Sequence, residues 1–340
     1  MSGGDPRAKG EGLWDVIVVG GGAAGLSAAA VLSRAQRRVM IIDEEGPLSE
    51  RVTHSHGHDS VTDPRELIAS GRTEVRRSGA HLLDDTVINV HAGFTVTTAG
   101  GRVLQARQVL VATGASYPAP DLPGVRELWG TAVHTCPYCH GFDLRGQTLA
   151  VIGGMDGAVL KALLLSQWSN DVVFVYGPNE QTSIKDRLRL DTAGVRLYRG
   201  EVQELVARAD GELQGVRFVD GRLFPCAAVF VGQEPQPQDH ILRELGCRMT
   251  EAGMVVVDRD GRTSVPNLYA AGHVVDPFSQ AESAAGDGYR AALAINLNLL
   301  EHDLRSASDV FGPAMERLVA ERTGGLGRHG LGWSEGMMHF

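Results

Sequence analysis

Two cysteines separated by two residues are the most chemically distinctive feature of this 340-residue sequence. Cys136 and Cys139 are close enough to close a small disulfide ring, and His140 follows directly. A thiol pair with this spacing can exchange electrons with another thiol pair, and an imidazole can move the protons because it titrates near neutrality. The sequence therefore predicts a redox-active dithiol with Cys136, Cys139 and His140 as catalytic residues.

Metal binding and simple burial are the alternatives for these residues. A structural zinc site needs a second pair of Cys or His ligands, but Cys226 and Cys247 stand singly. The pair could instead be two buried cysteines in a loop. His54, His56 and His58 alternate along one segment, yet no Asp or Cys is placed to complete a metal site. We therefore expect no metal.

The composition is that of an ordinary globular protein. Hydrophobic residues make up 43% and charged residues 21% of the chain. The net charge is −9 without a basic cluster, which argues against nucleic acid as a partner. No apolar run is long enough to cross a bilayer, and the N-terminus lacks the apolar core of a secretory signal. Four cysteines with one close pair fit a reducing cytoplasm.

A glycine-rich turn near the N-terminus predicts a dinucleotide site. The apolar run 14–19 predicts a buried strand, and Gly20, Gly22 and Gly25 follow it before a run of helix formers. Glycines at these positions permit a tight turn, let the backbone approach a pyrophosphate and pack the helix on the strand. A second predicted strand ends at Asp43, whose carboxylate would bind a ribose hydroxyl. A turn without a ligand is the alternative.

The middle of the chain predicts a second nucleotide-type module whose ligand site is damaged. Predicted strands at 147–152 and 171–176 flank another glycine turn and helix. Met155 stands where the backbone should approach a pyrophosphate, and segment 177–182, which should bind a 2′-phosphate, contains no basic residue. We expect this module to support the dithiol rather than to bind nicotinamide productively.

From residue 13 to about residue 304 the sequence resembles the low-molecular-weight thioredoxin reductase family. The marks are the first glycine turn with Asp43, the Ala-Thr-Gly at 112–114, the Cys pair in an inserted module, and an Ala-Ala-Gly that ends at Gly272 before a helix. The resemblance implies an α/β fold of two Rossmann-like three-layer dinucleotide-binding domains, the second inserted into the first. It also implies FAD as cofactor and a homodimer.

The resemblance further implies domain limits and cofactor contacts. We expect a disordered lead at 1–12, an FAD domain built from 13–122 and 249–304, and an inserted NAD(P)H-type domain at 123–248 with a degenerate nucleotide site. Residues 305–340 form a C-terminal extension, either disordered or covering a substrate pocket or a dimer partner. The expected FAD-binding residues are Gly20, Gly22, Ala23, Ala24, Gly25, Asp43, Ala112, Thr113, Gly114, Gly272, His273, Gln280 and Ala281.

Departures from the reductase pattern favour one branch of the family. Reductases usually have an acid after the second Cys and another after the Gly272 position, and this chain has His140 and His273 there. The motif Thr-Cys-Pro-Tyr-Cys-His-Gly resembles the FAD-dependent dithiol oxidases of gliotoxin, holomycin and romidepsin biosynthesis. That resemblance implies disulfide formation in a small natural-product dithiol, with Cys136 as the outer cysteine and Cys139 nearest the flavin. Electrons would then reach O2 and give H2O2.

Two other functions stay open. One is a thioredoxin reductase-like disulfide reductase that takes electrons from NADPH or from another donor such as ferredoxin. The other is a non-enzymatic flavoprotein, for example a redox sensor. Neither a nucleic acid nor a membrane is expected as a partner.

Overall fold

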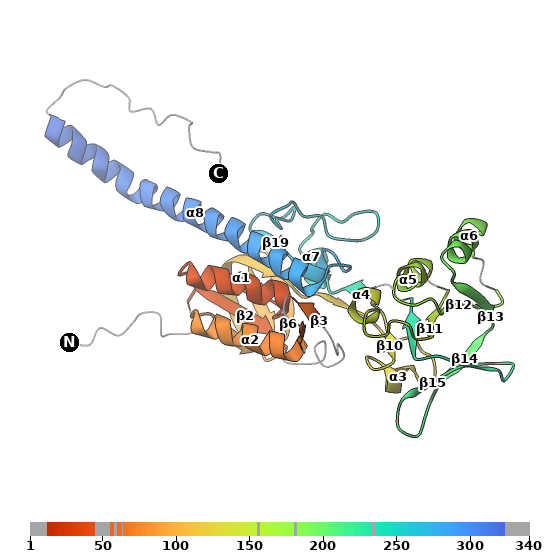
Figure 1. Ribbon diagram of the computed structural model, residues 1–340. Helices are drawn as coiled ribbons and strands as arrows, with labels where there is room; N and C mark the ends of the chain where they lie inside the picture. Colours follow the sequence, from red (N-terminus) through yellow and green to blue (C-terminus); the bar gives the residue numbers. More distant parts are fainter. Residues whose placement is uncertain are drawn as a thin grey trace. The chain divides into compact units, whose positions relative to one another are not determined.

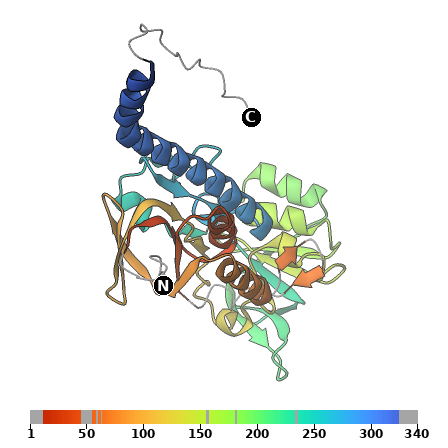
Figure 2. The same ribbon diagram turned by 90° about the vertical axis from the view of Figure 1, so that its left-hand side faces the viewer.

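The computed structural model describes residues 12–44, 55–57, 60–62, 64–154, 157–179, 182–232 and 235–323. By their internal contacts, residues 1–294 form one compact unit and residues 295–340 a second. The first unit has a three-layer α/β fold built on two largely parallel sheets (Figure 1; Figure 2). Met155, nearly all of the predicted N-terminal lead and residues 324–340 lie outside the described residues.

Apolar strands from both ends of the first unit build a seven-stranded sheet. β1 (Trp14–Val19) pairs in parallel with β2 (Val39–Asp43) and with β8 (Val103–Val111). β5 (His81–Asp84) extends the β2 side, and β19 (Leu268–Ala270) pairs in parallel with β8. Two antiparallel strands complete this sheet beside β8, namely β6 (Val87–His91) and β7 (Thr95–Thr98). The chain therefore returns to its first sheet at β19, after it has formed the second sheet.

Small residues let the first helix pack closely on this sheet. α1 (Ala23–Arg34) links β1 to β2 and buries Ala28 and Ala29 completely. α2 (Pro64–Arg77) packs beside α1, where a Cβ on Gly71 would come within 2.9 Å of Leu26 Cδ1. The glycine turn before α1 is thereby fixed at the carboxyl end of β1, the position of ligands in open α/β sheets.

The second sheet has five parallel strands and apolar interiors on both faces. Its order is β10 (Val133–His134), β17 (Ala228–Val231), β11 (Leu149–Ile152), β12 (Val172–Tyr176) and β13 (Arg196–Arg199). Its helices are α5 (Ala158–Leu165) and α6 (Ile184–Thr192). An antiparallel sheet joins it through β14 (Val202–Ala207), β15 (Leu213–Phe218) and β16 (Leu223–Pro225). These two sheets confirm the predicted fold class.

Short elements connect the sheets. The two-stranded pairs are β3 (Ser55–Gly57) with β4 (Ser60–Thr62) and β9 (Ala115–Ser116) with β18 (Gln236–Pro237). The remaining helices are α3 (Val125–Leu128), α4 (Pro137–His140), α7 (His240–Glu244), the 3₁₀ turn η2 (Gly272–Val274) and α8 (Ala281–Thr323). None of the described helices is long and apolar enough to cross a membrane.

Three local sequence patterns predict elements that differ from the observed ones. The runs 103–106 and 109–115 predict two strands, but residues 103–111 form the single strand β8, whose polar Gln108 is buried and interrupts the apolar pattern. The run 255–258 predicts a strand, but it contributes only an isolated bridge between Met249 and Val255. The segments 288–302 and 310–322 predict two separate helices, but both belong to one helix, α8, of 43 residues.

Candidate active site

Cys136 and Cys139 form a disulfide at the start of the short helix α4. Their Cα atoms are 5.5 Å apart. Cys136 is the N-cap residue, and the backbone N–H of Cys139 donates to its Sγ at 3.2 Å. Pro137 suits the first helical position because its fixed φ is helical and its missing N–H needs no partner there. Local sequence therefore places both sulfurs at one end of α4.

Trp168 holds the turn that follows the disulfide. A Cβ added to Gly141 would lie 2.6 Å from Trp168 Cε3 and 2.7 Å from Pro137 O, so no larger residue fits. Trp168 also meets the ring of Tyr138 edge-on, with centroids 5.9 Å apart. The position of α4 is thus set by close packing.

His140 stacks on a second histidine that the sequence analysis did not single out. The rings of His134 and His140 lie 3.9 Å apart at 25°. His134 is buried on β10, pairs with Phe230 across the sheet and is tilted against the Phe230 ring at 5.5 Å. The stack therefore ties the imidazole that follows the disulfide to β10, the edge strand beside β17. His134 stands only two residues before Cys136, but nothing in the local pattern indicates the stacking.

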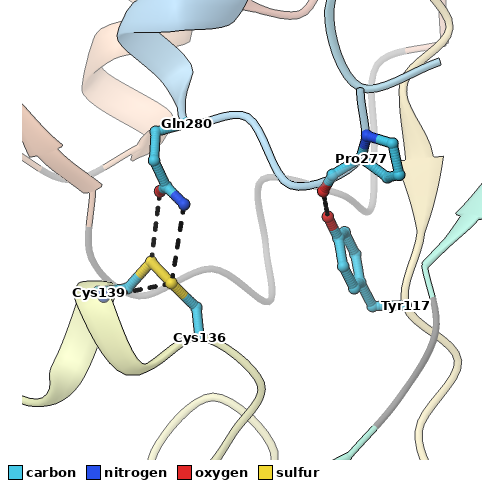
Figure 3. The surroundings of a disulfide bond; sticks show 5 residues. All are labelled: Tyr117, Cys136, Cys139, Pro277 and Gln280. Carbon is cyan, nitrogen blue, oxygen red and sulfur yellow. Dashed lines mark hydrogen bonds between the residues drawn. A yellow bond between two sulfur atoms is a disulfide. The ribbon is translucent and has the colours of Figure 1, made fainter. Parts of the chain in front are cut away.

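The side chain of Gln280 contacts both sulfurs (Figure 3). Cys139 Sγ lies 3.5 Å from Gln280 Oε1, and Gln280 Nε2 lies 3.8 Å from Cys136 Sγ. The sequence analysis assigned Gln280 to FAD as a family expectation. The structure places its amide at the disulfide, which joins the redox pair to the segment that begins α8.

Hydrogen bonds fix the backbone on either side of this glutamine. Tyr117 Oη donates to Pro277 O at 2.7 Å, and burial raises the pKa of Tyr117, which keeps the hydroxyl protonated (Figure 3). The backbone N–H of Gln280 donates to Ser283 Oγ at 2.9 Å, and this hydroxyl donates to Gln280 O at 3.0 Å. Ser283 thus caps the start of α8 in the manner of a capping box.

The first glycine turn has the shape that a pyrophosphate needs. Gly20 has φ +103, and a Cβ on Gly25 would overlap Gly20 O, so both positions require glycine. A Cβ on Gly22, by contrast, would meet nothing within 4 Å. That open space lies at the N-terminus of α1, whose N–H groups favour an anion.

Asp43 stands at the end of β2, as expected for the ribose contact. Gly21 N donates to its Oδ1 at 2.7 Å, and Arg72 Nη1 donates to its Oδ2 at 2.7 Å. Burial raises the pKa of Asp43, although the Gly21 N–H and the Arg72 charge oppose the rise. Arg72 also pairs with Asp84 and is itself buried. No local pattern indicates this arginine, because Arg72 lies on α2, 29 residues beyond Asp43 in the sequence.

The remaining expected FAD contacts gather around the same turn. A Cβ on Gly20 would be 2.7 Å from the carbonyl carbon of Ala112, and one on Gly272 would be 2.9 Å from Ala24 Cβ. Nε2 of His273 is buried and has no hydrogen-bond partner among the described residues. A buried donor or acceptor needs a partner, which a bound cofactor would supply. Ala23 begins α1, Ala281 begins α8, and Ala112, Thr113 and Gly114 follow β8 directly.

These features fit FAD. The open space at Gly22 would admit the pyrophosphate, Asp43 would meet the ribose, and His273 would supply a polar contact in place of the usual acid. Thioredoxin reductase-like proteins are FAD-binding flavoproteins, and the glycine turn, Asp43 and His273 of this chain are suited to hold that cofactor. No group of three His, Cys, Asp or Glu side chains suited to a metal occurs among the described residues, a set that leaves out His54 and His58.

Two arginines lie at the carboxyl end of β12 in the second sheet. Arg199 Nη2 donates to Pro178 O at 2.9 Å, and Arg187 Cζ lies 5.8 Å from the centroid of the Tyr176 ring. Segment 177–182 itself contains no basic residue. The positive charges at this end of β12 come from Arg187 on α6 and Arg199 on β13.

Comparison with known proteins finds disulphide oxidoreductases and thioredoxin reductases among the similar proteins. Residues 14–288 match the model of the pyridine nucleotide-disulphide oxidoreductase family. A thioredoxin reductase of Listeria innocua is 30% identical over 298 residues, covering 83% of this chain and 92% of that protein. The crystal structure of HlmI superimposes with a TM-score of 0.86 at 41% identity, over 90% of this chain and 98% of that one. A putative thioredoxin reductase of Bacillus anthracis gives a TM-score of 0.78 at 30% identity, over 85% of this chain and 99% of that one.

Proposed function

We propose, from the premise that this chain belongs to the pyridine nucleotide-disulphide oxidoreductase family, that it oxidises a small-molecule dithiol to a disulfide. The chain is a thioredoxin reductase-like oxidoreductase and a flavoprotein. The finer proposal is an FAD-dependent dithiol oxidase that works as a cytoplasmic homodimer and uses O2 as its acceptor. When bound, FAD would supply a two-electron acceptor for the reduced cysteine pair, with O2 as the final acceptor and H2O2 as the product.

The observation that carries the proposal is the stacked imidazole pair beside the disulfide. An oxidase must remove protons from two substrate thiols, because thiolates and not thiols attack disulfides. His140 follows the second cysteine where the reductases have an acid, and a neutral imidazole is a suitable proton acceptor. The chain is 41% identical to HlmI and 30% identical to the two thioredoxin reductases cited, so it is less similar to those reductases than to HlmI.

Exposed aromatic rings support a small organic substrate. Tyr138 lies between the cysteines, and Phe142 lies in the turn that follows α4. They are 59% and 56% exposed, which is high for rings of this size. Both rings belong to the segment that carries the disulfide, and in this proposal they border the substrate's approach to it.

The proposed reaction begins with thiolate attack on Cys136. A substrate thiolate bonds to Cys136 Sγ, the disulfide breaks, and Cys139 is released as a thiolate. The second substrate thiolate then attacks the substrate sulfur held on Cys136, which forms the product disulfide and frees Cys136. The substrate loses two electrons to the cysteine pair, and of its two protons one ends on His140 and the other on Cys139.

A second candidate is an NADPH-dependent disulfide reductase. The specific observation in its favour is the pair Arg187 and Arg199 at the end of β12, where a 2′-phosphate would bind in a nucleotide module of this type. This candidate would act on a thioredoxin-like protein rather than on a small dithiol.

Flavin absorbance without oxygen separates the two candidates. The purified yellow protein is mixed with NADPH or, separately, with dithiothreitol, and air is then admitted. Bleaching by the dithiol alone, followed by recovery of colour with peroxide in air, is the expected result. Bleaching by NADPH would replace the oxidase proposal with the reductase.

The variant Cys139→Ser tests the relay through the pair. It should keep oxidised yellow flavin that the dithiol cannot bleach, because Cys136 alone offers no disulfide for a substrate thiolate to attack. Bleaching at the wild-type rate would show that electrons bypass the pair. Cys226→Ser is the matched control and should behave as wild type.

A further inference from the structure

Gln280 holds its side-chain amide against both sulfurs of the redox pair. Oε1 lies 3.5 Å from Cys139 Sγ and Nε2 lies 3.8 Å from Cys136 Sγ. We propose that Gln280 is a catalytic residue that stabilises the thiolate of Cys136 when the pair becomes reduced. This inference rests on the proposed function, and it gives Gln280 a role in the chemistry beyond the cofactor contact expected from the sequence.

An amide suits a pair that holds one thiol and one thiolate. Its NH2 group donates and its carbonyl accepts. With Nε2 towards Cys136, a thiolate there gains a charge-assisted hydrogen bond, while a thiol on Cys139 would donate to Oε1. The backbone N–H of Cys139 also points at Cys136 Sγ, at 3.2 Å. The Cys136 thiolate therefore has two donors in the observed geometry.

These donors act when the product leaves. The second substrate thiolate forms the product disulfide, the bond between the substrate sulfur and Cys136 Sγ breaks, and Cys136 departs as a thiolate. A thiolate of lower pKa is a better leaving group in this exchange. Hydrogen bonds that favour the charged form lower the pKa of the thiol, so Gln280 accelerates product release.

Gln280 is well placed because its backbone is fixed. Tyr117 anchors Pro277 (Figure 3). Ser283 binds both the N–H and the carbonyl of Gln280. The titratable groups on the elements around the pair include Tyr138 and His140 of α4, His134 of β10 stacked on His140, Asp276 before Gln280, and Glu282 of α8. Substitution at Gln280 leaves all of these groups in place.

Alkylation of the reduced protein tests the proposal directly. The rate at which iodoacetamide modifies Cys136 is followed against pH by mass spectrometry, in wild type, Gln280→Met and Gln280→Glu. Methionine keeps the length without a donor, so the midpoint for Cys136 should rise by about one pH unit. Glutamate adds a negative charge and should raise it further. Gln105→Met, at an exposed position of β8, is the matched control.

An unchanged alkylation midpoint in Gln280→Met would overturn the role assigned to Gln280. The measurement needs no turnover and applies equally to protein stripped of FAD, so a variant that binds the cofactor poorly is compared with stripped wild type. Failure of the dithiol to bleach wild-type flavin would instead refute the oxidase proposal. The two failures are therefore separable.

Discussion

The four cysteines sit in different environments, and this decides their reactivity. Cys136 and Cys139 are half-buried beside backbone and amide donors, whereas Cys226 and Cys247 are buried. Burial raises the pKa of Cys226 to about 12 and also raises the pKa of Cys247. Because the thiolate is the reactive species, only the first pair can react in the folded protein near neutral pH.

Thiol counting checks this difference. After reduction, a chromogenic disulfide reagent at pH 8 should titrate two thiols in the folded protein and all four after unfolding. Cys136→Ser/Cys139→Ser should lower the folded count to none. A third fast thiol in folded wild type would contradict the inert state of Cys226 and Cys247.

Glycine is required at positions 22 and 25 of the same turn for different physical reasons. Gly22 has φ −75 and open space where a Cβ would stand, so Gly22→Ala should fold normally. Its methyl group would nevertheless enter the space where the pyrophosphate approaches, and we expect FAD affinity to fall on the order of tenfold or more.

Gly25→Ala should instead destabilise the folded protein, because no space is open at that position. Its methyl group would overlap the backbone oxygen of Gly20, and such overpacking costs about 1–3 kcal/mol. Thermal unfolding of the stripped proteins and FAD titration separate the two effects. Equal loss of stability in both variants would contradict this division of roles.

At the scale of elements, β10 and α4 together orient the proposed proton acceptor. His134 is fixed by the sheet and His140 ends the helix, so their stack links a rigid strand to a single helical turn. His134→Leu removes the stacking face but keeps an apolar side chain. We expect the rate of flavin bleaching by dithiol to fall on the order of tenfold, because a misoriented base loses part of its contribution.

A double-mutant cycle tests whether His134 acts through His140. In a His140→Asn background, His134→Leu should cause little further loss, since interacting residues are not additive. His134→Phe, which can still stack, should recover much of the rate. An equal loss from His134→Leu in both backgrounds would mean that His134 acts elsewhere.

At the scale of the whole molecule, one buried ammonium makes stability depend on pH. Lys161 Nζ donates to Val231 O at 2.7 Å and joins α5 to β17. Burial lowers the pKa of Lys161 to about 8 from 10.5. Below pH 8 the lysine is charged in both folded and unfolded chains, so the full cost of burying the charge is present. Between pH 8 and 10.5 only the unfolded chain holds the proton, and this cost shrinks as pH rises.

Lys161→Met should therefore have its most favourable effect on melting temperature near pH 7. The melting temperature of the variant minus that of the wild type should fall as the pH rises from 7 to 9.5. Loss of the hydrogen bond to the Val231 carbonyl lowers the variant's melting temperature by a constant amount and does not change this trend. The exposed Lys185→Met on α6 is the matched control. A difference that stays constant with pH would contradict the lowered pKa.

Patterns within short segments determined much of this protein. The Cys136–Cys139 spacing, the glycine turn and the strand that ends at Asp43 follow from turn chemistry and hydrophobic periodicity, which act over neighbouring residues. Those patterns predicted β1, α1, β2 and the strands β11 and β12 of the second sheet correctly. They failed at β8, where the buried Gln108 breaks the apolar run although the strand continues.

Only the tertiary structure decided which distant groups meet. Gln280 lies 141 residues beyond Cys139, and no local pattern relates them until the chain returns to the first sheet through β19. Likewise, Arg199 reaches Pro178 only because β13 pairs with β12, and His134 meets His140 only because α4 folds back on β10. Sequence specifies elements through local energetics, whereas contacts between elements depend on packing of the whole chain. The chemistry of the disulfide was therefore predictable, and its surroundings were not.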